Sequence, residues 1–203
     1  LRSLVGSEMC IRDRIMVMVT QIGEFRAMFI LSAVLTLLLL ALRQWRQAAF
    51  AGATLLCTAL ANTGSKWFFA RVRPEVLSEP LTSFSMPSGH SSGSFALFLT
   101  LAVLAGRGQP PRMRLTWLLL GCLPAAAIAL SRVYLGAHWP TDILAGAMLA
   151  ACVCAASLTL SQWQGPLKPM PARAWWLLLP VMLLMCGYMA TRHLPHALLR
   201  YAY

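Results

Sequence analysis

Apolar residues gather in six long runs along the 203-residue chain, and short polar links separate them. Apolar runs of this length are typical of helices that cross a membrane. Several are shorter than the roughly 20 residues that a spanning helix prefers, so we expect their ends to extend into the polar flanks. The pattern predicts an all-α, polytopic transmembrane bundle of about six spanning helices, at residues 26–42, 48–70, 91–106, 115–131, 141–160 and 174–191.

Composition and charge support this architecture. The chain is 59% hydrophobic and only 11% charged, which is too apolar for a soluble domain. The net charge of +11 does not indicate a nucleic-acid partner, because the basic residues sit at the ends of apolar runs and form no stripe. We therefore expect one membrane-embedded domain surrounded by membrane lipids; the sequence leaves its oligomeric state open.

Basic residues also predict the orientation of the bundle. If the links alternate between the two membrane faces, one face carries most of the basic residues that have no candidate chemical role. Such a face is usually cytoplasmic. We expect a bacterial plasma (inner) membrane protein whose candidate chemistry faces the periplasm or exterior, with the cytoplasmic face marked by Arg43, Arg46, Arg107, Arg112, Arg114, Lys168 and Arg173.

The first residues have a different character. Leu4–Arg14 resembles the translation of a transposon-end adapter used in sequencing libraries. We expect residues 1–14 to be a non-native sequencing scar and residues 15–203 to form the membrane-embedded domain. An even number of spans would start the chain on the outer face, so we expect the source gene to encode one more apolar helix upstream of Ile15.

Lys66 and Arg73 are the first candidate chemical pair. They are seven residues apart, so on a helix that ends near Pro74 they would face the same side. Two cations converging at a helix end can hold the nonbridging oxygens of a phosphate. Arg71 is more typical of a basic side chain that reaches the membrane interface, and we give it no catalytic role.

The tetrapeptide of residues 87–90 precedes another apolar run. We expect a helix to start there, with Ser88 as its cap and Gly89 allowing the backbone to approach an oxyanion. The free N–H groups of a helix start attract anions. His90 would then lie beside a bound phosphate, although this block taken alone favours an ordinary serine cap with a chance histidine.

The third block joins Ser131 and Arg132 to His138 and Asp142. His138 and Asp142 are four residues apart, which is one helical turn. Asp142 is also the only carboxylate after Glu79, and an acid kept in so apolar a stretch is a functional candidate. We expect Asp142 to accept from one ring nitrogen of His138, leaving the other nitrogen free to attack.

The three blocks read KWFFARVRP, PSGH and SRVYLGAHWPTD. In order, spacing and every specified position they match K-x6-R-P, P-S-G-H and S-R-x5-H-x3-D. The chain thus resembles the type-2 phosphatidic acid phosphatases (lipid phosphate phosphatases), which are related to vanadium haloperoxidases. The resemblance implies an acid phosphatase/vanadium haloperoxidase-like helical core and the hydrolysis of a lipid phosphate or lipid pyrophosphate.

The resemblance also implies a role for each residue. His138 attacks phosphorus and becomes a phosphohistidine, while His90 protonates the leaving oxygen and then activates water. Asp142 orients His138. The phosphate is held by Lys66, Arg73 and Arg132 and by N–H groups near Ser88 and Gly89.

Two alternatives use the same residues. A lipid phosphotransferase would pass the phosphoryl group to another lipid, and a non-catalytic carrier would only bind lipid phosphates. A carrier needs only the cations, so the two histidines and Asp142 favour an enzyme. Because the sequence offers no carboxylate cluster for magnesium, we expect no metal and no cofactor.

Overall fold

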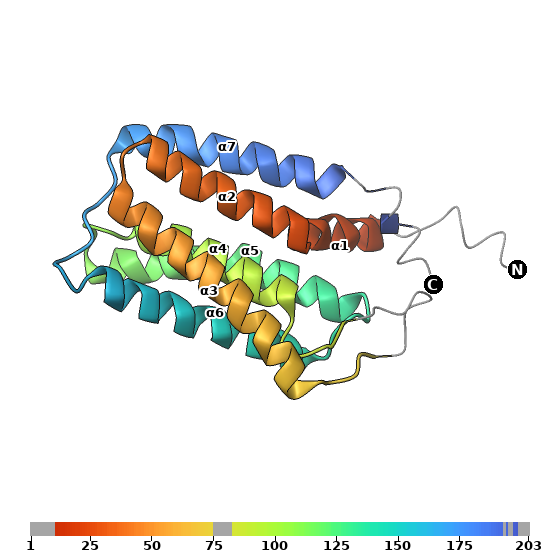
Figure 1. Cartoon of the computed structure of the whole chain (residues 1–203). Coiled ribbons are helices and arrows are strands. Elements are labelled where there is room, and N and C mark those ends of the chain that lie inside the picture. The colour runs from red at the N-terminus through yellow and green to blue at the C-terminus, as the bar shows by residue number, and fades with distance from the viewer. Residues whose placement is uncertain (1–10, 75–82, 193, 195–196, 199–203) are drawn as a thin grey trace, which may run out of the picture.

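Seven α-helices run through the residues described by the structure, a computed structural model that covers residues 11–74, 83–192, 194 and 197–198 (Figure 1). From α2 onward they run alternately up and down a long bundle, and the described residues contain no β-strand. The helices are α1 (Ile11–Ile22), α2 (Phe25–Ala41), α3 (Trp45–Phe69), α4 (Gly89–Ala105), α5 (Pro111–Tyr134), α6 (Pro140–Ser161) and α7 (Ala172–Thr191).

The predicted all-α bundle is confirmed, and α2 to α7 occupy the six predicted runs. By length and composition α5, α6 and α7 could each cross a membrane, and the bent pair α1–α2 is a fourth candidate among the described helices. α3 falls short because its last turns are polar, from Asn62 to Lys66. α4 is apolar but has only 17 residues.

α4 is the central helix of the bundle and packs against α2, α3, α5 and α6. Its buried hydroxyl groups bond to helix carbonyls: Ser94 donates to Ser91 O and Thr100 to Ala96 O within α4, and Ser91 donates to Ile143 O of α6. A polar side chain surrounded by helices in a membrane is stabilised by such bonds. α4 can therefore carry several serines through the middle of the bundle.

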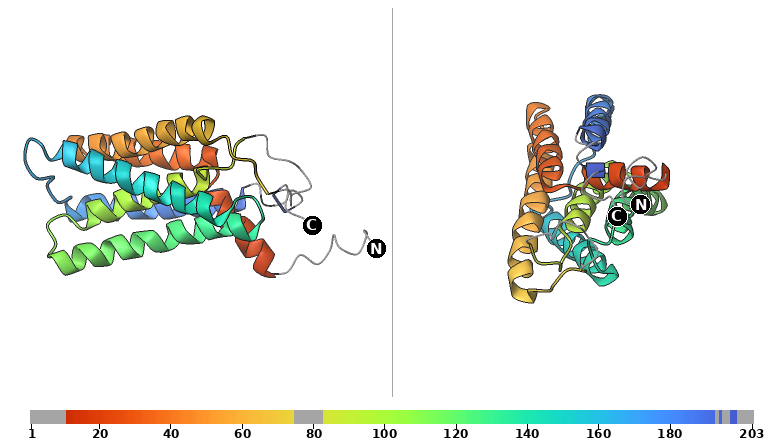
Figure 2. Two further views of the ribbon diagram at one scale, coloured as in Figure 1. Left: turned by 90° about the horizontal axis from the view of Figure 1, so that it is seen from below. Right: turned by 90° about the vertical axis from the view of Figure 1, so that its right-hand side faces the viewer.

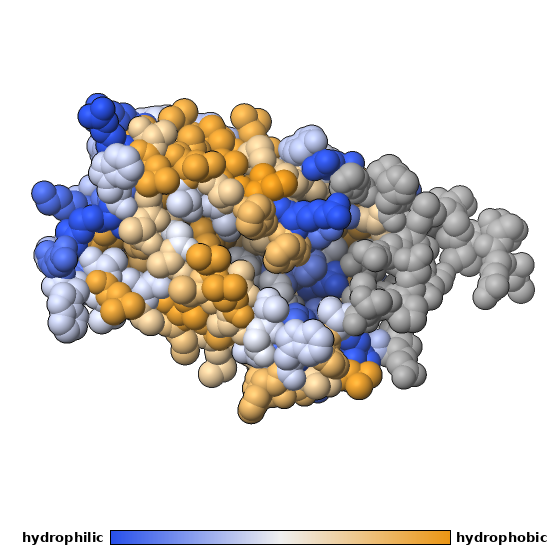
Figure 3. All heavy atoms as spheres, viewed as in Figure 1, coloured by the Kyte–Doolittle hydropathy of each residue, from blue (hydrophilic) through white to orange (hydrophobic). Residues whose placement is uncertain are grey.

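The outer surface is apolar over the middle of the helices. Figure 3 shows hydrophobic residues across the centre of the visible face and hydrophilic residues toward the ends. Large apolar side chains such as Leu60, Leu123 and Leu183 are exposed there. This distribution suits a bundle whose sides face lipid chains.

All three sequence blocks lie at one end of the bundle. That end holds the last turn of α3, the first turn of α4, the last turn of α5 and the first turn of α6 (Figure 2). The up-and-down order of the helices makes this convergence unavoidable. The links that carry the basic residues lie at the opposite end.

The start of the chain differs from the prediction. α1 is a seventh helix; it turns away from α2 by 51°, with Gly23 and Glu24 at the break (Figure 2). The first turn of α1 falls within residues 11–14, where we expected a sequencing scar; residues 1–10 lie outside the described part. That the scar is non-native stays a prediction, as does a missing upstream helix.

Gly146 sets how closely α6 can approach the start of α4. A Cβ atom at this position would lie 2.7 Å from Ser88 O and 3.0 Å from Ser92 N. Both are backbone atoms, so a larger residue must separate the two helices. Gly187 in α7 meets nothing within 4 Å and serves as a matched helical glycine.

We predict opposite effects for the same substitution at these two glycines. Gly146→Ala should destabilise the protein by about 1–3 kcal/mol through overpacking. Gly187→Ala should be neutral or stabilise it by up to about 1 kcal/mol, because alanine favours a helix. Thermal unfolding of the two variants in detergent micelles checks this, and equal melting temperatures would contradict the proposed close contact.

Candidate active site

A cavity of about 1400 Å³ opens where the three blocks meet. Six predicted site residues line it: Lys66, Arg73, Gly89, His90, Arg132 and His138. They come from the end of α3 and the segment after it, the start of α4, the end of α5 and the α5–α6 link. The structure thus brings together residues up to 72 positions apart in one cavity wall.

His138 lies between an arginine and a carboxylate. Arg73 Nη1 is 3.1 Å from His138 Nε2, and Asp142 Oδ2 is 3.4 Å from Nδ1. A guanidinium can only donate hydrogen bonds, so Nε2 of the neutral ring must be the acceptor. The ring proton then sits on Nδ1, facing Asp142, and Nε2 carries the lone pair. This is the arrangement that the sequence predicts for an attacking histidine.

The surroundings of His138 favour its neutral form. Burial lowers the pKa of His138 to about 4; the hydrogen bond with Asp142 acts in the opposite direction, and the charge of Arg73 acts with burial. Neutral imidazole is the nucleophilic form. At neutral pH the His138 ring is therefore uncharged, and its Nε2 carries a lone pair.

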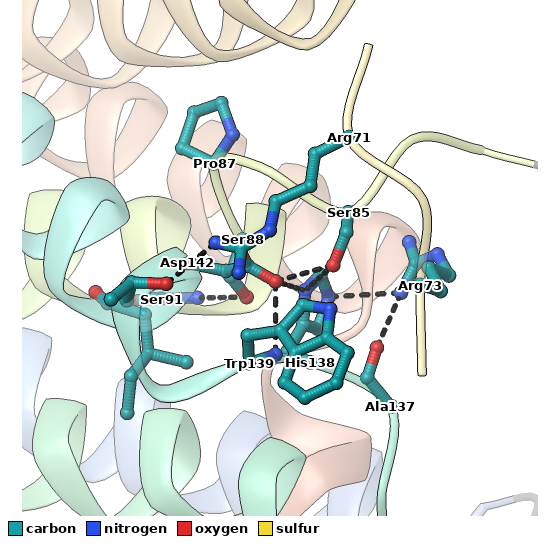
Figure 4. A network of polar contacts seen from close by, with 12 residues as sticks. Arg71, Arg73, Ser85, Pro87, Ser88, Ser91, Ala137, His138, Trp139 and Asp142 are labelled. Atoms are coloured by element: carbon teal, nitrogen blue, oxygen red, sulfur yellow. Dashed lines mark hydrogen bonds and ion pairs between the residues drawn. The ribbon is translucent and has the colours of Figure 1, made fainter. Parts of the chain in front are cut away.

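Asp142 is fully buried and accepts from several groups besides His138 (Figure 4). Oδ1 accepts from Arg71 Nη1 at 3.0 Å, and Oδ2 accepts from the Ser85 hydroxyl and, at 2.9 Å, from Trp139 N. The last bond caps the start of α6, where Pro140 is the first residue. A buried carboxylate needs such donors to remain charged.

Arg71 corrects the sequence interpretation. We predicted that it reaches toward the membrane interface, and this is wrong: its guanidinium pairs with Asp142. Ser85 is a second contact of Asp142 that the sequence analysis missed. Neither residue belongs to a specified position of the three blocks, and only their proximity to the motifs could have pointed to them.

The geometry predicted for Lys66 and Arg73 is also wrong. α3 ends at Phe69, and Ala70 takes a left-handed conformation with φ of 44°, so Arg73 lies beyond the helix. The two cations still share the cavity wall, because the chain turns back over the site. Lys66 Nζ donates to Phe84 O, and Arg73 Nε donates to Ser83 O at 2.7 Å.

The block of residues 87–90 starts α4 as predicted. Ser88 is the N-cap, and its hydroxyl accepts from Ser91 N at 3.4 Å. The Ser88 N–H, however, donates to Asp142 O at 3.0 Å, and its fully buried side chain is absent from the cavity wall. Gly89 and His90 line the cavity. Ser88 therefore anchors α4 to α6, and its N–H, which we predicted to face a phosphate, instead bonds to Asp142 O.

The break between α1 and α2 closes the other side of the site. A Cβ atom at Gly23 would lie 2.9 Å from Cδ2 of His90, so this backbone lies against the ring. Arg132 is almost fully buried, and its Nη1 donates to Thr20 Oγ1 at 3.1 Å. No pattern in the sequence predicts either contact, since Thr20 and Gly23 precede the first apolar run.

From the site the cavity continues between α2 and α3 into the apolar part of the bundle. Its wall there includes Phe25, Met28, Ser32, Leu37, Gly52 and Leu56. Along α3 the cavity wall reaches from Lys66 to Gly52, which is about 21 Å at 1.5 Å per residue. A polar end with cations and histidines is thus continuous with a long apolar groove.

Metal ligands do not gather around this cavity. Within the described residues, no group of three or more His, Cys, Asp and Glu side chains is placed to hold a metal ion. The polar groups at the site are instead cations and imidazoles, which suit an anionic ligand.

A family model described as the PAP2 superfamily matches residues 47–166. The chain belongs to the PAP2 superfamily. The matched segment includes nearly all of α3, the whole of α4 to α6, and all three sequence blocks. α1, α2 and α7 lie outside it.

Two curated relatives resemble part of this PAP2 chain. An undecaprenyl-diphosphatase of Sulfolobus acidocaldarius is 37% identical over 105 residues, which are 49% of this chain and 45% of the relative. A phosphatidylglycerophosphatase B of Bacillus subtilis is 34% identical over 93 residues, 43% of this chain and 44% of the relative. The match with this PAP2 chain spans less than half the length of each relative.

Two crystal structures share the PAP2 chain's fold. A transmembrane PAP2-type phosphatidylglycerolphosphate phosphatase from Bacillus subtilis superposes with a TM-score of 0.66 at 22% identity, covering 79% of this chain and 82% of that one. Aquifex aeolicus LpxE superposes with a TM-score of 0.59 at 21% identity, covering 78% and 92%. At these identities the likeness establishes the fold alone.

We predict that His138 of this PAP2 protein titrates near pH 4, far below an ordinary histidine. Because the hydrogen bond with Asp142 raises the pKa of His138, Asp142→Asn should move the titration to still lower pH. NMR of histidine-labelled protein in micelles measures both values, with His138→Gln to assign the signal. A titration midpoint near pH 6.5 would show that the His138 side chain is more exposed to water than it is in the structure.

Proposed function

We propose that this PAP2 protein is an integral-membrane phosphatase that hydrolyses a lipid phosphate or lipid pyrophosphate through a phosphohistidine intermediate, without a metal ion. The observation that carries the proposal is the His138 ring, with Nδ1 toward Asp142 and Nε2 toward the cations of the cavity. Binding alone requires no oriented imidazole. An enzyme that attacks phosphorus does.

In the proposed first step, His138 Nε2 attacks phosphorus while the bond to the lipid oxygen breaks. Lys66, Arg73 and Arg132 stabilise the charge on the phosphoryl oxygens. In the structure Arg73 contacts Nε2 of His138, so its side chain must move to the phosphate when the substrate binds. His90 donates a proton to the leaving oxygen, and the negative charge of the bound phosphate favours the protonated form of His90.

In the second step His90 accepts a proton from water, and the water oxygen attacks phosphorus. The bond between phosphorus and His138 breaks, which releases inorganic phosphate and restores both histidines. Asp142 stabilises the positive charge that develops on the His138 ring in the first step. The proton returns to His90 in each cycle, so the reaction requires no other acid or base.

The groove between α2 and α3 supports a lipid substrate. Its length of about 21 Å exceeds one leaflet of the hydrocarbon core, which is about 15 Å thick. A hydrocarbon tail can lie in this groove while its phosphate reaches the cations. Both curated relatives are named for lipid phosphates or diphosphates. We propose the same substrate class for this chain, namely a phosphate or pyrophosphate attached to a lipid tail.

We also propose that the site faces the exterior of a bacterial inner membrane. The basic links lie at the end of the bundle opposite to the cavity, and basic links favour the cytoplasm. Cysteine labelling from outside intact cells, with single cysteines in the 162–171 link and in the 135–139 link, tests this orientation.

A turnover assay tests the function. We expect phosphate release from a lipid phosphate or pyrophosphate in micelles, with a lower KM than for a water-soluble phosphate ester that has no tail. Activity should survive EDTA and be inhibited by vanadate, which mimics the trigonal-bipyramidal transition state. Loss of activity in EDTA that magnesium restores would refute the metal-free mechanism, and transfer to an added lipid acceptor in place of water would favour a phosphotransferase.

The two histidines should give different defects. His138→Ala should abolish the covalent phosphoenzyme and lower turnover by at least about 10³-fold. His90→Ala should lower turnover by about 10²–10⁴-fold and let the phosphoenzyme accumulate when the leaving group is good. Rapid-quench trapping of acid-labile phosphate checks both, with the exposed Arg26→Ala as a control. Phosphate trapped on His90 would reverse the assignment.

A further inference from the structure

Arg71 holds the carboxylate that orients His138. Its Nη1 is 3.0 Å from Asp142 Oδ1, while Oδ2 of the same carboxylate faces His138 Nδ1. The two carboxylate oxygens thus have separate partners. Because a carboxylate is planar, fixing Oδ1 also fixes the direction of Oδ2.

The Arg71 side chain is itself held in place. Nη1 also donates to Thr141 Oγ1 at 2.6 Å, and the guanidinium carbon lies 5.6 Å from the centre of the Trp139 ring. Such contacts restrict a long side chain that is 38% exposed. Arg71 therefore forms a fixed link between the segment after α3 and the first turn of α6.

The backbone of Arg71 holds Ser85 as well. Arg71 O accepts from Ser85 N at 2.8 Å, and the Ser85 hydroxyl donates to Asp142 Oδ2. One residue thus supports the carboxylate at both oxygens, through its side chain at Oδ1 and through Ser85 at Oδ2 (Figure 4).

Arg71 differs from the other cations of the site in its position. Lys66, Arg73 and Arg132 line the cavity, and Arg71 does not. It lies on the Asp142 side of the His138 ring, whereas Arg73 lies on the Nε2 side. In the structure Arg71 therefore contacts Asp142 and does not line the cavity in which the phosphate would bind.

We propose that Arg71 is a positioning residue, which acts on catalysis through Asp142 and not on the phosphate. It keeps Oδ2 directed at Nδ1, so that the His138 proton stays on Nδ1 and Nε2 keeps its lone pair. The consequence for turnover rests on the proposed function, whereas the consequence for the His138 tautomer does not.

Three variants and a double-mutant cycle test the proposal. Arg71→Met keeps a long side chain over Trp139 but removes the charge and the donors, Arg71→Lys keeps one cationic donor, and Arg26→Ala removes an exposed arginine at the same end of the bundle. Arg71→Met should lower kcat about 10–100-fold, as expected for loss of an outer partner of a reacting group. KM and the inhibition constant of inorganic phosphate should stay unchanged, Arg71→Lys should recover part of kcat, and Arg26→Ala should match the wild type.

In the Asp142→Asn background, Arg71→Met should have almost no further effect, because the group through which it acts is already lost. If the two substitutions lowered kcat independently, or if Arg71→Met weakened inhibition by inorganic phosphate, Arg71 would act on the phosphate and the proposal would be overturned.

Nitrogen-15 NMR of His138 gives a test that needs no turnover, and it is made in an Arg73→Met background, where no guanidinium holds Nε2 as an acceptor. This background alone and with Arg71→Lys should show a single neutral tautomer with the proton on Nδ1, and with Arg71→Met it should show a mixture. A single unchanged tautomer in Arg71→Met would refute the role of Arg71 even in an active phosphatase. Absence of turnover in the wild type, with the tautomer shift present, would refute only the proposed function.

Discussion

A carboxylate buried in an apolar bundle must be surrounded by donors, and in this protein the donors of Asp142 hold the site together. They come from Arg71 after α3, Ser85 before α4 and Trp139 at the start of α6. The backbone of Asp142 also accepts from Ser88 N. Satisfying this one charge brings the three sequence blocks into contact, because each block or its flank supplies a donor or a neighbour.

The same constraint explains why the site lies at the helix ends. Helix ends leave backbone N–H and C=O groups unpaired, and those groups need partners inside a membrane protein. Here Phe84 O and Ala137 O accept from Lys66 and Arg73, and the Ser88 N–H donates to Asp142 O. The cations are thus held by the carbonyls of neighbouring links.

The sequence predicted the parts of the structure that hydropathy and short-range spacing control. The six apolar runs became α2 to α7, Ser88 caps α4, and His138 contacts Asp142. The errors arose where one residue redirects the chain. Ala70 turns the backbone before Pro74, so Arg73 leaves the helix and Arg71 points to Asp142. A single sequence cannot distinguish such a turn from a continued helix with basic residues at its end. α1 was missed because its first turn is charged and interrupts the apolar pattern.

Two parts of the chain form the walls of the cavity: one carries the cations and histidines, and the other lines the apolar groove. The cations and histidines lie on α3 to α6 and the segments between them, inside the PAP2 match, whereas α2, which lines one side of the groove, lies outside it. Residues such as Ser32 and Leu37 contact no reacting group, so exchanging them leaves the geometry at phosphorus intact. The fold is in this sense modular: under the proposed function, substitutions in α2 would change which lipid tail the groove accepts and would leave the cations and histidines in place.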